Sequence, residues 1–299
     1  MTERRESAGP YLALIVVQFC FGSLPVIGKV VLRTVPPLSV VGFRVGITAI
    51  LLIVFQIIRG RFWLKEKGDY WRLAALSLFG VTLNQLLFVS GLSLTKAANS
   101  SLLAATIPIF ALTVGSIIGT EKMRPLKIGG IVLALTGVLL IIDPRNASFS
   151  SATTLGDILI VVNSLSFGIY VATSKPVVTR NGAFRSMMWV FIFGAVVCIP
   201  VGAWSFASLA IDGITPLIWL LIFHLAVVST TIPYLLNAWS LARVNPSTVA
   251  VFIYLQPLIG FLLAVAFLGE HIGLKFVFAA LLIFAGVFLV TKKFVPIET

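Results

Sequence analysis

The sequence predicts an all-α integral membrane protein in which ten transmembrane helices form two five-helix repeats of inverted topology. Three observations support this fold class. Hydrophobic residues make up 59% of the 299 residues and charged residues only 11%, so the chain is far more apolar than a water-soluble domain. Apolar runs of about 20 residues, the length of a membrane-spanning helix, recur along it. The second half of the chain also repeats the residue spacing of the first half.

The candidate membrane spans are ten apolar segments separated by brief loops. Because the loops are short, consecutive helices are expected to be antiparallel neighbours. The fifth segment is short for a span, and we expect it to pack closely on its neighbours. The segments cover residues 11–31, 37–58, 72–92, 99–119, 127–142, 156–176, 186–206, 215–240, 248–268 and 274–291.

An internal repeat relates the stretches 108–137 and 257–286. Each stretch has a proline, a glutamate 13 positions later and a glycine 16 positions after that, namely Pro108, Glu121 and Gly137 in the first and Pro257, Glu270 and Gly286 in the second. The match extends to helices 1 and 6, where Phe21, Gly22 and Lys29 correspond to Phe167, Gly168 and Lys175. The repeat predicts two units, residues 1–145 and 150–299. Five helices per unit would place the second unit upside down in the membrane, a plan found in alternating-access carriers.

The distribution of basic residues predicts the orientation. Most Lys and Arg residues fall in loops on the side of the two termini, and the opposite side keeps only Arg33, Lys96, Arg145 and Lys275. Basic residues are enriched in cytoplasmic loops, so we expect a multi-pass protein with both termini in the cytoplasm. The net charge of +12 is scattered in short clusters instead of forming one stripe, which argues against nucleic acid as a partner.

Residue patterns in several helices resemble a known family. The run Phe21-Gly22-Ser23-Leu24-Pro25 with Lys29, and Pro36-Pro37-Leu38 followed by Arg44, resemble the first two helices of EamA-type members of the drug/metabolite transporter superfamily. The pattern from Pro257 through Gly269-Glu270 to Gly286 does so too. The resemblance covers essentially the whole chain and is greatest to bacterial inner-membrane exporters of aromatic and other amino acids. Two positions depart from the family pattern: Phe21-Gly22 replaces Trp-Gly, and Thr120-Glu121 replaces Gly-Glu.

Polar and aromatic side chains inside the spans are the candidate substrate-binding residues. On helix 6, Asn163, Ser166, Tyr170 and Ser174 recur at steps of three and four residues and therefore share one face. Amide and phenol groups are costly to bury in lipid, so such faces are expected to converge on a wet central cavity. The candidates are Gln18, Arg44, Asn84, Gln85, Asn163, Tyr170, His224, Tyr234, Asn237, Trp239 and Tyr254.

Charged residues near the spans have two alternative roles. Arg44 lies about two turns into helix 2, where it either forms a structural tie to backbone carbonyls, Asp143 or Asp157, or contacts an anionic substrate. Glu121 and Glu270 are expected to end helices 4 and 9 and to pair with nearby cations such as Lys122 or Lys275.

Energy coupling is expected to be simple because every acidic residue lies in a loop, a tail or a helix end. Carboxylates at the middle of the membrane are the usual proton or sodium relay. We therefore expect facilitated export or exchange. Proton coupling through His224 is the alternative, since histidine titrates near neutral pH, and a purely structural histidine is a further one.

Prolines inside the spans are the predicted hinges, because proline removes a backbone hydrogen bond and bends a helix. The hinges are Pro25, Pro108, Pro233 and Pro257. Pro108 and Pro257 occupy equivalent positions of the repeat, so helices 4 and 9 are expected to bend reciprocally as the cavity opens to one side and then to the other.

The predicted function is the export of aromatic and other apolar amino acids through this cavity by alternating access. Aromatic rings suit the apolar part of such a solute, and amide groups suit its amino and carboxyl groups. Export of drugs or of nucleoside-like metabolites is the alternative, and an intramembrane enzyme is less consistent with the residues present. The expected partners are the lipid bilayer and the small-molecule substrate, with the chain monomeric or weakly dimeric. No cofactor and no metal ion is predicted.

Overall fold

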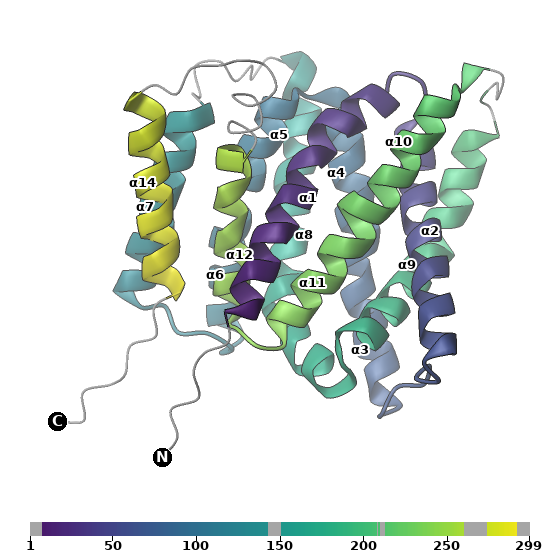
Figure 1. Ribbon diagram of the computed structural model, residues 1–299, viewed down its shortest axis with the longest axis horizontal. Coiled ribbons are helices and arrows are strands. Elements are labelled where there is room, and N and C mark those ends of the chain that lie inside the picture. Colours follow the sequence, from purple (N-terminus) through teal and green to yellow (C-terminus); the bar gives the residue numbers. More distant parts are fainter. Residues whose placement is uncertain (1–7, 143–150, 208, 210–212, 260–273, 292–299) are drawn as a thin grey trace.

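The computed structural model describes residues 8–142, 151–207, 209, 213–259 and 274–291. Within these ranges the chain is helical and contains no strand (Figure 1). Seven of the described helical stretches are long and apolar enough to cross a membrane, and shorter apolar helices accompany them. The predicted all-helical membrane protein is therefore confirmed at this level.

The first half of the chain contains long helices with one widened turn in the third stretch. The helix α3 runs directly into the π-helical turn η1 and then into α4. The elements are α1 (Gly9–Val31), α2 (Pro37–Ile58), α3 (Gly68–Ser77), η1 (Leu78–Thr82), α4 (Leu83–Leu94), α5 (Ala97–Ala104), α6 (Ile107–Ile117) and α7 (Pro125–Ile142).

The second half contains a comparable series. Here α10 runs into the π-helical turn η4 and then into α11. The elements are α8 (Ser151–Asn181), α9 (Ala183–Phe206), α10 (Pro216–Ala226), η4 (Val227–Thr231), α11 (Ile232–Leu241), α12 (Pro246–Val251), the 3₁₀ turn η5 (Phe252–Tyr254) and α14 (Leu274–Thr291). The ninth predicted span, 248–268, is described only as far as Ile259.

Local sequence explains where several helices begin and end. Pro37, Pro216 and Pro246 each occupy the first helical position, where the missing N–H of proline costs nothing. The Thr215 side chain caps α10 by accepting a hydrogen bond from the Ile218 amide. Between α8 and α9 the chain turns at Gly182, whose φ of 83° is accessible to glycine at little steric cost.

The helices pack in pairs that are distant in sequence. The helices α7 and α14 lie side by side at one edge of the molecule, and α2 and α9 lie together at the opposite edge (Figure 1). Between them, α8 packs along α4 and α6, while α1 packs along α11. The start of α1 and the end of α14 lie at the same end of the bundle (Figure 1), which we call the terminal end. The opposite end, where α1 ends and α2 begins, is the far end.

Small residues allow the closest helix contacts. A Cβ added at Gly130 of α7 would lie 2.9 Å from the Gly286 carbonyl oxygen of α14, and one added at Gly137 would lie 2.7 Å from the Ala279 carbonyl oxygen. Gly42 and Gly202 bring α2 and α9 together in the same way. In a membrane the hydrophobic effect does not drive helices together. Van der Waals packing between closely approaching backbones stabilises their association instead.

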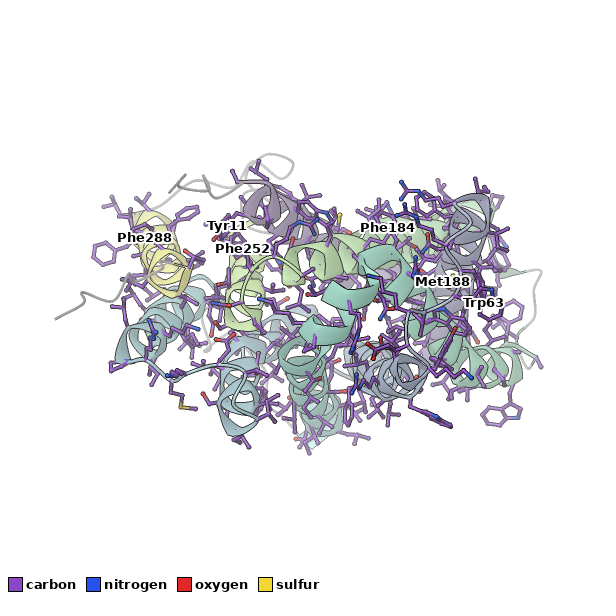
Figure 2. All side chains as sticks on the ribbon, turned by 90° about the horizontal axis from the view of Figure 1, so that it is seen from below. Tyr11, Trp63, Phe184, Met188, Phe252 and Phe288 are labelled. Carbon is purple, nitrogen blue, oxygen red and sulfur yellow. The ribbon has the colours of Figure 1, made fainter. Side chains whose placement is uncertain are left out.

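Apolar side chains cover the outside of the bundle. Trp63 and Phe288, which are 71% and 61% exposed, point away from it on different sides (Figure 2). Leu, Ile, Val and Phe side chains on the outer faces of α1, α2, α10 and α14 are exposed as well. A surface this apolar on long helices is the one that lipid contacts.

The terminal end is closed by polar contacts between distant segments. Glu121 forms an ion pair with Lys127, and its Oε1 accepts a hydrogen bond of 2.6 Å from the Ser247 amide at the start of α12. A nearby cation was the expected partner of Glu121, and it is Lys127 in the first turn of α7, whereas the suggested Lys122 does not form this pair. The equivalent prediction for Glu270 falls outside the described residues. Nearby, the Lys175 Nζ donates to the Val244 carbonyl at 2.8 Å.

Candidate functional site

A cavity lies inside the bundle between its middle and the far end. It comprises about 660 Å³ of space unoccupied by atoms, including the part open to solvent. The lining residues come from eight of the helical elements described above and, in the case of Gln256, from the helical residues 255–259. They are Phe21, Leu24, Pro25, Arg44, Asn84, Gln85, Phe88, Ser100, Ser101, Ala104, Ile107, Asn163, Phe167, Tyr234, Ile253 and Gln256.

Five of the predicted substrate-binding residues line this cavity together. Arg44 comes from α2, Asn84 and Gln85 from α4, Asn163 from α8 and Tyr234 from α11. The predicted convergence of the polar faces of the third, sixth and eighth spans therefore occurs at one place.

The hydroxyl group of Tyr234 is the centre of a hydrogen-bond network on the cavity wall. Its oxygen lies 2.8 Å from both the Gly80 carbonyl oxygen and the Asn84 Oδ1, either of which it can donate to. It accepts from the Gln85 Nε2 at 3.2 Å. The Asn84 Nδ2 in turn donates to the Asn163 Oδ1 at 2.7 Å. This network joins α4, α8 and α11 and holds three amide groups, those of Asn84, Gln85 and Asn163, at the cavity surface.

The widened turns η1 and η4 supply backbone acceptors to the interior. A π-helical turn leaves carbonyl groups without their regular helical partner. In η1 the Phe79 carbonyl accepts from the Ser166 hydroxyl at 2.7 Å, and the Gly80 carbonyl faces Tyr234. In η4 the Ser229 carbonyl faces the guanidinium of Arg44. Side chains from neighbouring helices thus complete both turns.

Arg44 is a buried cation at the edge of the cavity. Arg44 is only 2% exposed. Its Nε donates to the Thr230 Oγ1 at 3.0 Å, and one terminal nitrogen lies 3.5 Å from the Ser229 carbonyl oxygen. Of its suggested acidic partners, Asp157 accepts from Thr95, and Asp143 lies outside the described residues. The structural tie to backbone is present, and the guanidinium also lines the cavity.

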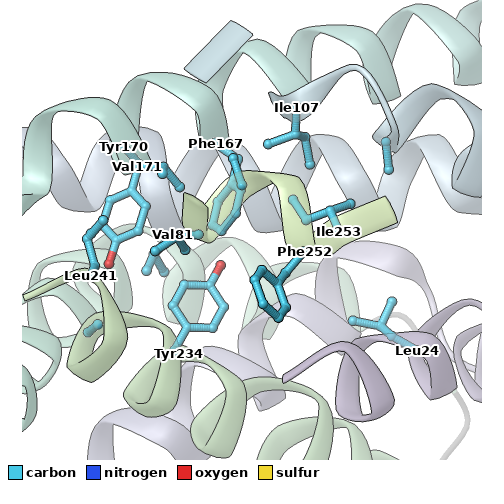
Figure 3. Close-up of a cluster of buried hydrophobic side chains, with 14 of the residues drawn as sticks. Leu24, Val81, Ile107, Phe167, Tyr170, Val171, Tyr234, Leu241, Phe252 and Ile253 are labelled. Carbon is cyan, nitrogen blue, oxygen red and sulfur yellow. The ribbon is translucent and has the colours of Figure 1, made fainter. Parts of the chain in front are cut away.

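Aromatic rings form the apolar part of the wall. Phe21 of α1 and Phe167 of α8 both meet the ring of Tyr234 edge to face, with centroids 6.3 and 6.4 Å away. Figure 3 shows Phe167, Tyr170 and Tyr234 in one cluster, with the hydroxyl of Tyr234 on the side of Phe167. Edge-to-face packing fixes the ring positions, so the wall is preformed.

The other predicted substrate-binding residues do not line this cavity. Gln18 lies behind it and accepts from the lining residue Gln256 at 2.8 Å. Tyr170 stacks on Phe167, and its hydroxyl approaches the Met187 sulfur. Half-buried His224 lies 3.3 Å from the Ser23 hydroxyl.

Three more predictions fall elsewhere in the bundle. Trp239 packs under the guanidinium of Arg243, 4.0 Å from its ring centroid, at the terminal end. Asn237 and Tyr254 are buried within the bundle, and in the described structure the Asn237 Oδ1 and the Tyr254 hydroxyl have no hydrogen-bond partner. Neither residue lines the described cavity, so their contact with a solute stays a prediction.

Several lining residues were missed by the sequence analysis. Gln256, Phe88, Ser100 and Ser101 were not proposed as site residues, and Phe21 and Phe167 entered only as repeat matches. A signal existed for Gln256, which is an amide within a span and directly precedes the repeated Pro257. The repetition of the phenylalanine pair was a second usable signal.

The four predicted hinge prolines occupy different local settings. Pro25 lies inside the unbroken helix α1 and lines the cavity. Pro108 is the second residue of α6, directly after the break that separates α6 from α5, and Pro233 is the second residue of α11, directly after η4. Pro257 lies in the apolar stretch Pro246–Ile259.

Across the described residues, no three His, Cys, Asp or Glu side chains gather closely enough to hold a metal ion. The polar groups of the cavity are amides, hydroxyls and one guanidinium. These groups recognise polar and anionic parts of a solute by hydrogen bonding.

Comparison with known proteins gives one family and several related chains. The sequence pattern of the EamA-like transporter family matches residues 9–143 and, a second time, residues 154–292. An uncharacterized transporter of Archaeoglobus fulgidus is 26% identical over 271 residues, which cover 89% of this chain and 91% of that protein. The uncharacterized transporter YoaV of Bacillus subtilis is 25% identical over 295 residues, covering 95% of this chain and 97% of its own.

A third relative and one solved structure extend the comparison. The uncharacterized inner membrane transporter YedA of Escherichia coli is 22% identical, with coverage of 94% of this chain and 90% of its own. A chain described only as "Crystal structure of protein" superposes with a TM-score of 0.74 at 18% identity, covering 95% of this chain and 97% of that chain. That likeness concerns the fold alone.

Proposed function

The chain belongs to the EamA-like transporter family, and from this premise we propose that it exports aromatic and other apolar amino acids across a bacterial inner membrane. The relatives reported above are transporters, one of them of an inner membrane. The observation that carries the substrate proposal is the composition of the cavity wall. Its aromatic rings, amide groups and single guanidinium suit a solute with one apolar side chain and a few polar groups.

Two inverted repeats around the cavity would provide alternating access, and contacts at repeat-related positions support this part of the proposal. Gln85 and Tyr234, which are 149 positions apart like Pro108 and Pro257, bond to each other. The turns η1 and η4 are also offset by 149 positions. Residues that a two-fold axis relates can contact each other only where both lie close to the axis. We therefore place the axis that exchanges the repeats beside the Tyr234 network.

Reciprocal contacts between α7 and α14 support the same symmetry. Gly130 meets Gly286, and Gly137 meets Ala279. The repeat spacing of 149 relates Gly130 to Ala279 and Gly137 to Gly286, so the two contacts exchange under the proposed axis. Two units related in this way would exchange their conformations between an inward-open and an outward-open state of similar free energy.

The described conformation corresponds to the state open toward the far end in this proposal. The cavity extends toward that end, while Lys175, Glu121 and Lys127 bond across the terminal end. If the terminal end is cytoplasmic, as the distribution of basic residues indicates, this is the outward-facing state. Reporter tags fused to each terminus should both be detected in the cytoplasm, and a tag exposed outside would refute the orientation.

Transport in this proposal follows the gradient of the substrate or exchanges one solute for another. No carboxylate lines the cavity within the described residues, so a midplane proton relay of the usual kind is lacking there. The alternative is proton coupling through His224. With the substrate gradient held constant, export should continue after a protonophore is added, and a complete loss of export would instead favour proton coupling.

Export of drugs or nucleoside-like metabolites is the second candidate, because a wall of aromatic rings, amides and hydroxyls would also suit such solutes. Overproduction of the protein in cells separates the two. We expect resistance to toxic amino-acid analogues and no resistance to cationic drugs. Substitution of Tyr234 should impair that resistance at unchanged protein level. Resistance to the drugs alone would overturn the amino-acid proposal.

A further inference from the structure

We propose that Arg44 is the receptor for a carboxylate group of the transported solute and that it makes the cavity selective for carboxylates over amines. The inference rests on the proposed transport function and adds a charge requirement to it. Its starting point is a cation buried at membrane depth whose described contacts are all neutral. Burial of a guanidinium is costly unless an anion compensates it.

Within the residues that the structure describes, Arg44 contacts hydrogen-bond acceptors and forms no ion pair. The Thr230 hydroxyl and the Ser229 carbonyl accept from it. Within the described parts of the chain the ion pairs involve Glu66, Asp69 and Glu121 as the acids, and none of them includes Arg44. The neutral contacts offset only part of the desolvation cost, so a further anion is expected from outside the protein.

Among the described residues, it is the cavity that gives an anion access to Arg44. Arg44 is one of its lining residues although it is 2% exposed. Its guanidinium has more N–H groups than the two described contacts use. A planar fork of this kind can bind both oxygens of a carboxylate at once.

The rest of the wall limits the solute to a single carboxylate. A phosphate or sugar phosphate normally requires several cations, whereas Arg44 is the one charged residue among the described lining. An amine without a carboxylate would meet this cation and find no acid opposite it. The amide groups of Gln85 and Gln256 remain suitable for the ammonium group of an amino acid.

The tie between Arg44 and η4 gives the binding event a structural consequence. A carboxylate in the cavity competes with the Ser229 carbonyl for the terminal nitrogen, whose present contact of 3.5 Å is long. Release of that contact would leave the widened turn between α10 and α11 with one fewer restraint. Substrate binding would then loosen the helix that carries Tyr234.

The test compares probes that share a phenyl ring and differ in their charged groups. The full-length protein in detergent is titrated with L-phenylalanine, 3-phenylpropionate, 2-phenylethylamine and phenyl phosphate, and its thermal unfolding midpoint is measured. The two carboxylates should stabilise the wild type, and the amine should not. In Arg44→Gln the concentration of carboxylate for half-maximal stabilisation should rise at least about tenfold. Arg44→Lys keeps the charge but loses the fork, so it should give an intermediate value.

Arg180→Gln is the matched control, because Arg180 pairs with Glu66 and Asp69 away from the cavity. It should bind the probes as the wild type does. Should Arg44→Gln fail to fold, Arg44→Lys carries the test, and its unchanged affinity for carboxylates would overturn the proposal. Stabilisation by the amine equal to that by the carboxylates, a stronger effect of phenyl phosphate, or no stabilisation by either carboxylate would overturn it too.

Counterflow of labelled phenylalanine in vesicles separates this inference from the proposed function. Carboxylate-dependent stabilisation that requires Arg44, without counterflow, would refute amino-acid export and leave the carboxylate site in place. Counterflow with the same half-saturation in Arg44→Gln and wild type would leave export in place and refute the site.

Discussion

At the scale of single residues, Tyr234 and Arg44 both line the cavity and make similar contacts. Each directs a side-chain donor at a carbonyl group of a π-helical turn, Tyr234 at Gly80 and Arg44 at Ser229. Each also faces the cavity. Each side chain therefore both restrains a helix and faces the proposed solute site. Changes at these positions should affect stability and transport together.

Tyr234→Phe removes the hydroxyl group and keeps the ring. The Gly80 carbonyl and the Asn84 amide then lose a partner at a buried position, so we expect a loss of about 1–2 kcal/mol in unfolding free energy. Transport should fall severalfold because the amides are no longer held in place. Denaturant unfolding in detergent and counterflow in vesicles measure the two effects.

Tyr70→Phe is the control for this prediction. The Tyr70 hydroxyl accepts from the Leu64 amide and does not contact the cavity. Its removal should leave transport unchanged. Equal transport by the Tyr234→Phe variant and wild type would show that the network is not part of the site.

At the scale of helices, the start of α12 depends on a carboxylate from another segment. Glu121, whose side chain is 3% exposed, caps α12 at Ser247 and pairs with Lys127. Glu121→Gln leaves Lys127 without its anion and weakens the cap. We expect a loss of about 2 kcal/mol in unfolding free energy, measured by denaturant unfolding.

Glu66→Gln is the matched surface substitution. Glu66 pairs with Arg180, but its side chain is 53% exposed, and solvent-exposed pairs contribute at most about 1 kcal/mol. If Glu66→Gln destabilised the protein as much as Glu121→Gln, the difference in burial between the two glutamates would not explain their contributions to stability.

Helix contact also explains which glycines are required. In Gly137→Ala the new methyl group would lie 2.7 Å from the Ala279 carbonyl oxygen, so α7 and α14 must separate. Overpacking of this kind costs about 1–3 kcal/mol. Gly129→Ala, eight positions earlier in the same helix, meets no atom within 4 Å and should be neutral or slightly stabilising. Thermal unfolding of both variants checks the difference, and equal effects would contradict the described α7 and α14 contact.

At the scale of the whole molecule, the position of the cavity predicts which side of the membrane reaches it. In a background with Cys20 and Cys198 replaced by alanine, Ser101→Cys places a thiol on the cavity wall. A membrane-impermeant maleimide added outside intact cells should label it. A transported amino acid in excess should slow the labelling by occupying the site.

Ser174→Cys provides the comparison. Ser174 lies on α8 nearer the terminal end and is fully buried at 0% exposure, so its thiol should not react from outside. Reaction of both thiols, or of Ser174→Cys alone, would contradict an outward-facing cavity.

The sequence alone determined that the chain is helical and which polar residues lie within its apolar segments. Apolar length and composition suffice for this, because a segment in lipid must satisfy its own backbone whatever its neighbours are. The spacing of Pro108 and Pro257 also indicated the repeat that the paired contacts support. Arg44, Asn84, Gln85, Asn163 and Tyr234 could be selected as site residues, since buried polar groups at these depths need polar surroundings.

Only the tertiary structure decided which of those side chains meet. Helical periodicity gives the face on which a residue lies, but packing sets the rotation of each helix relative to the others. For this reason Trp239 lies against Arg243 and not in the cavity, while Gln256 enters the wall. Side chains from segments far apart in the chain complete the π-helical turns, and Glu121 accepts from the Ser247 amide 126 positions away. No local pattern contains these contacts.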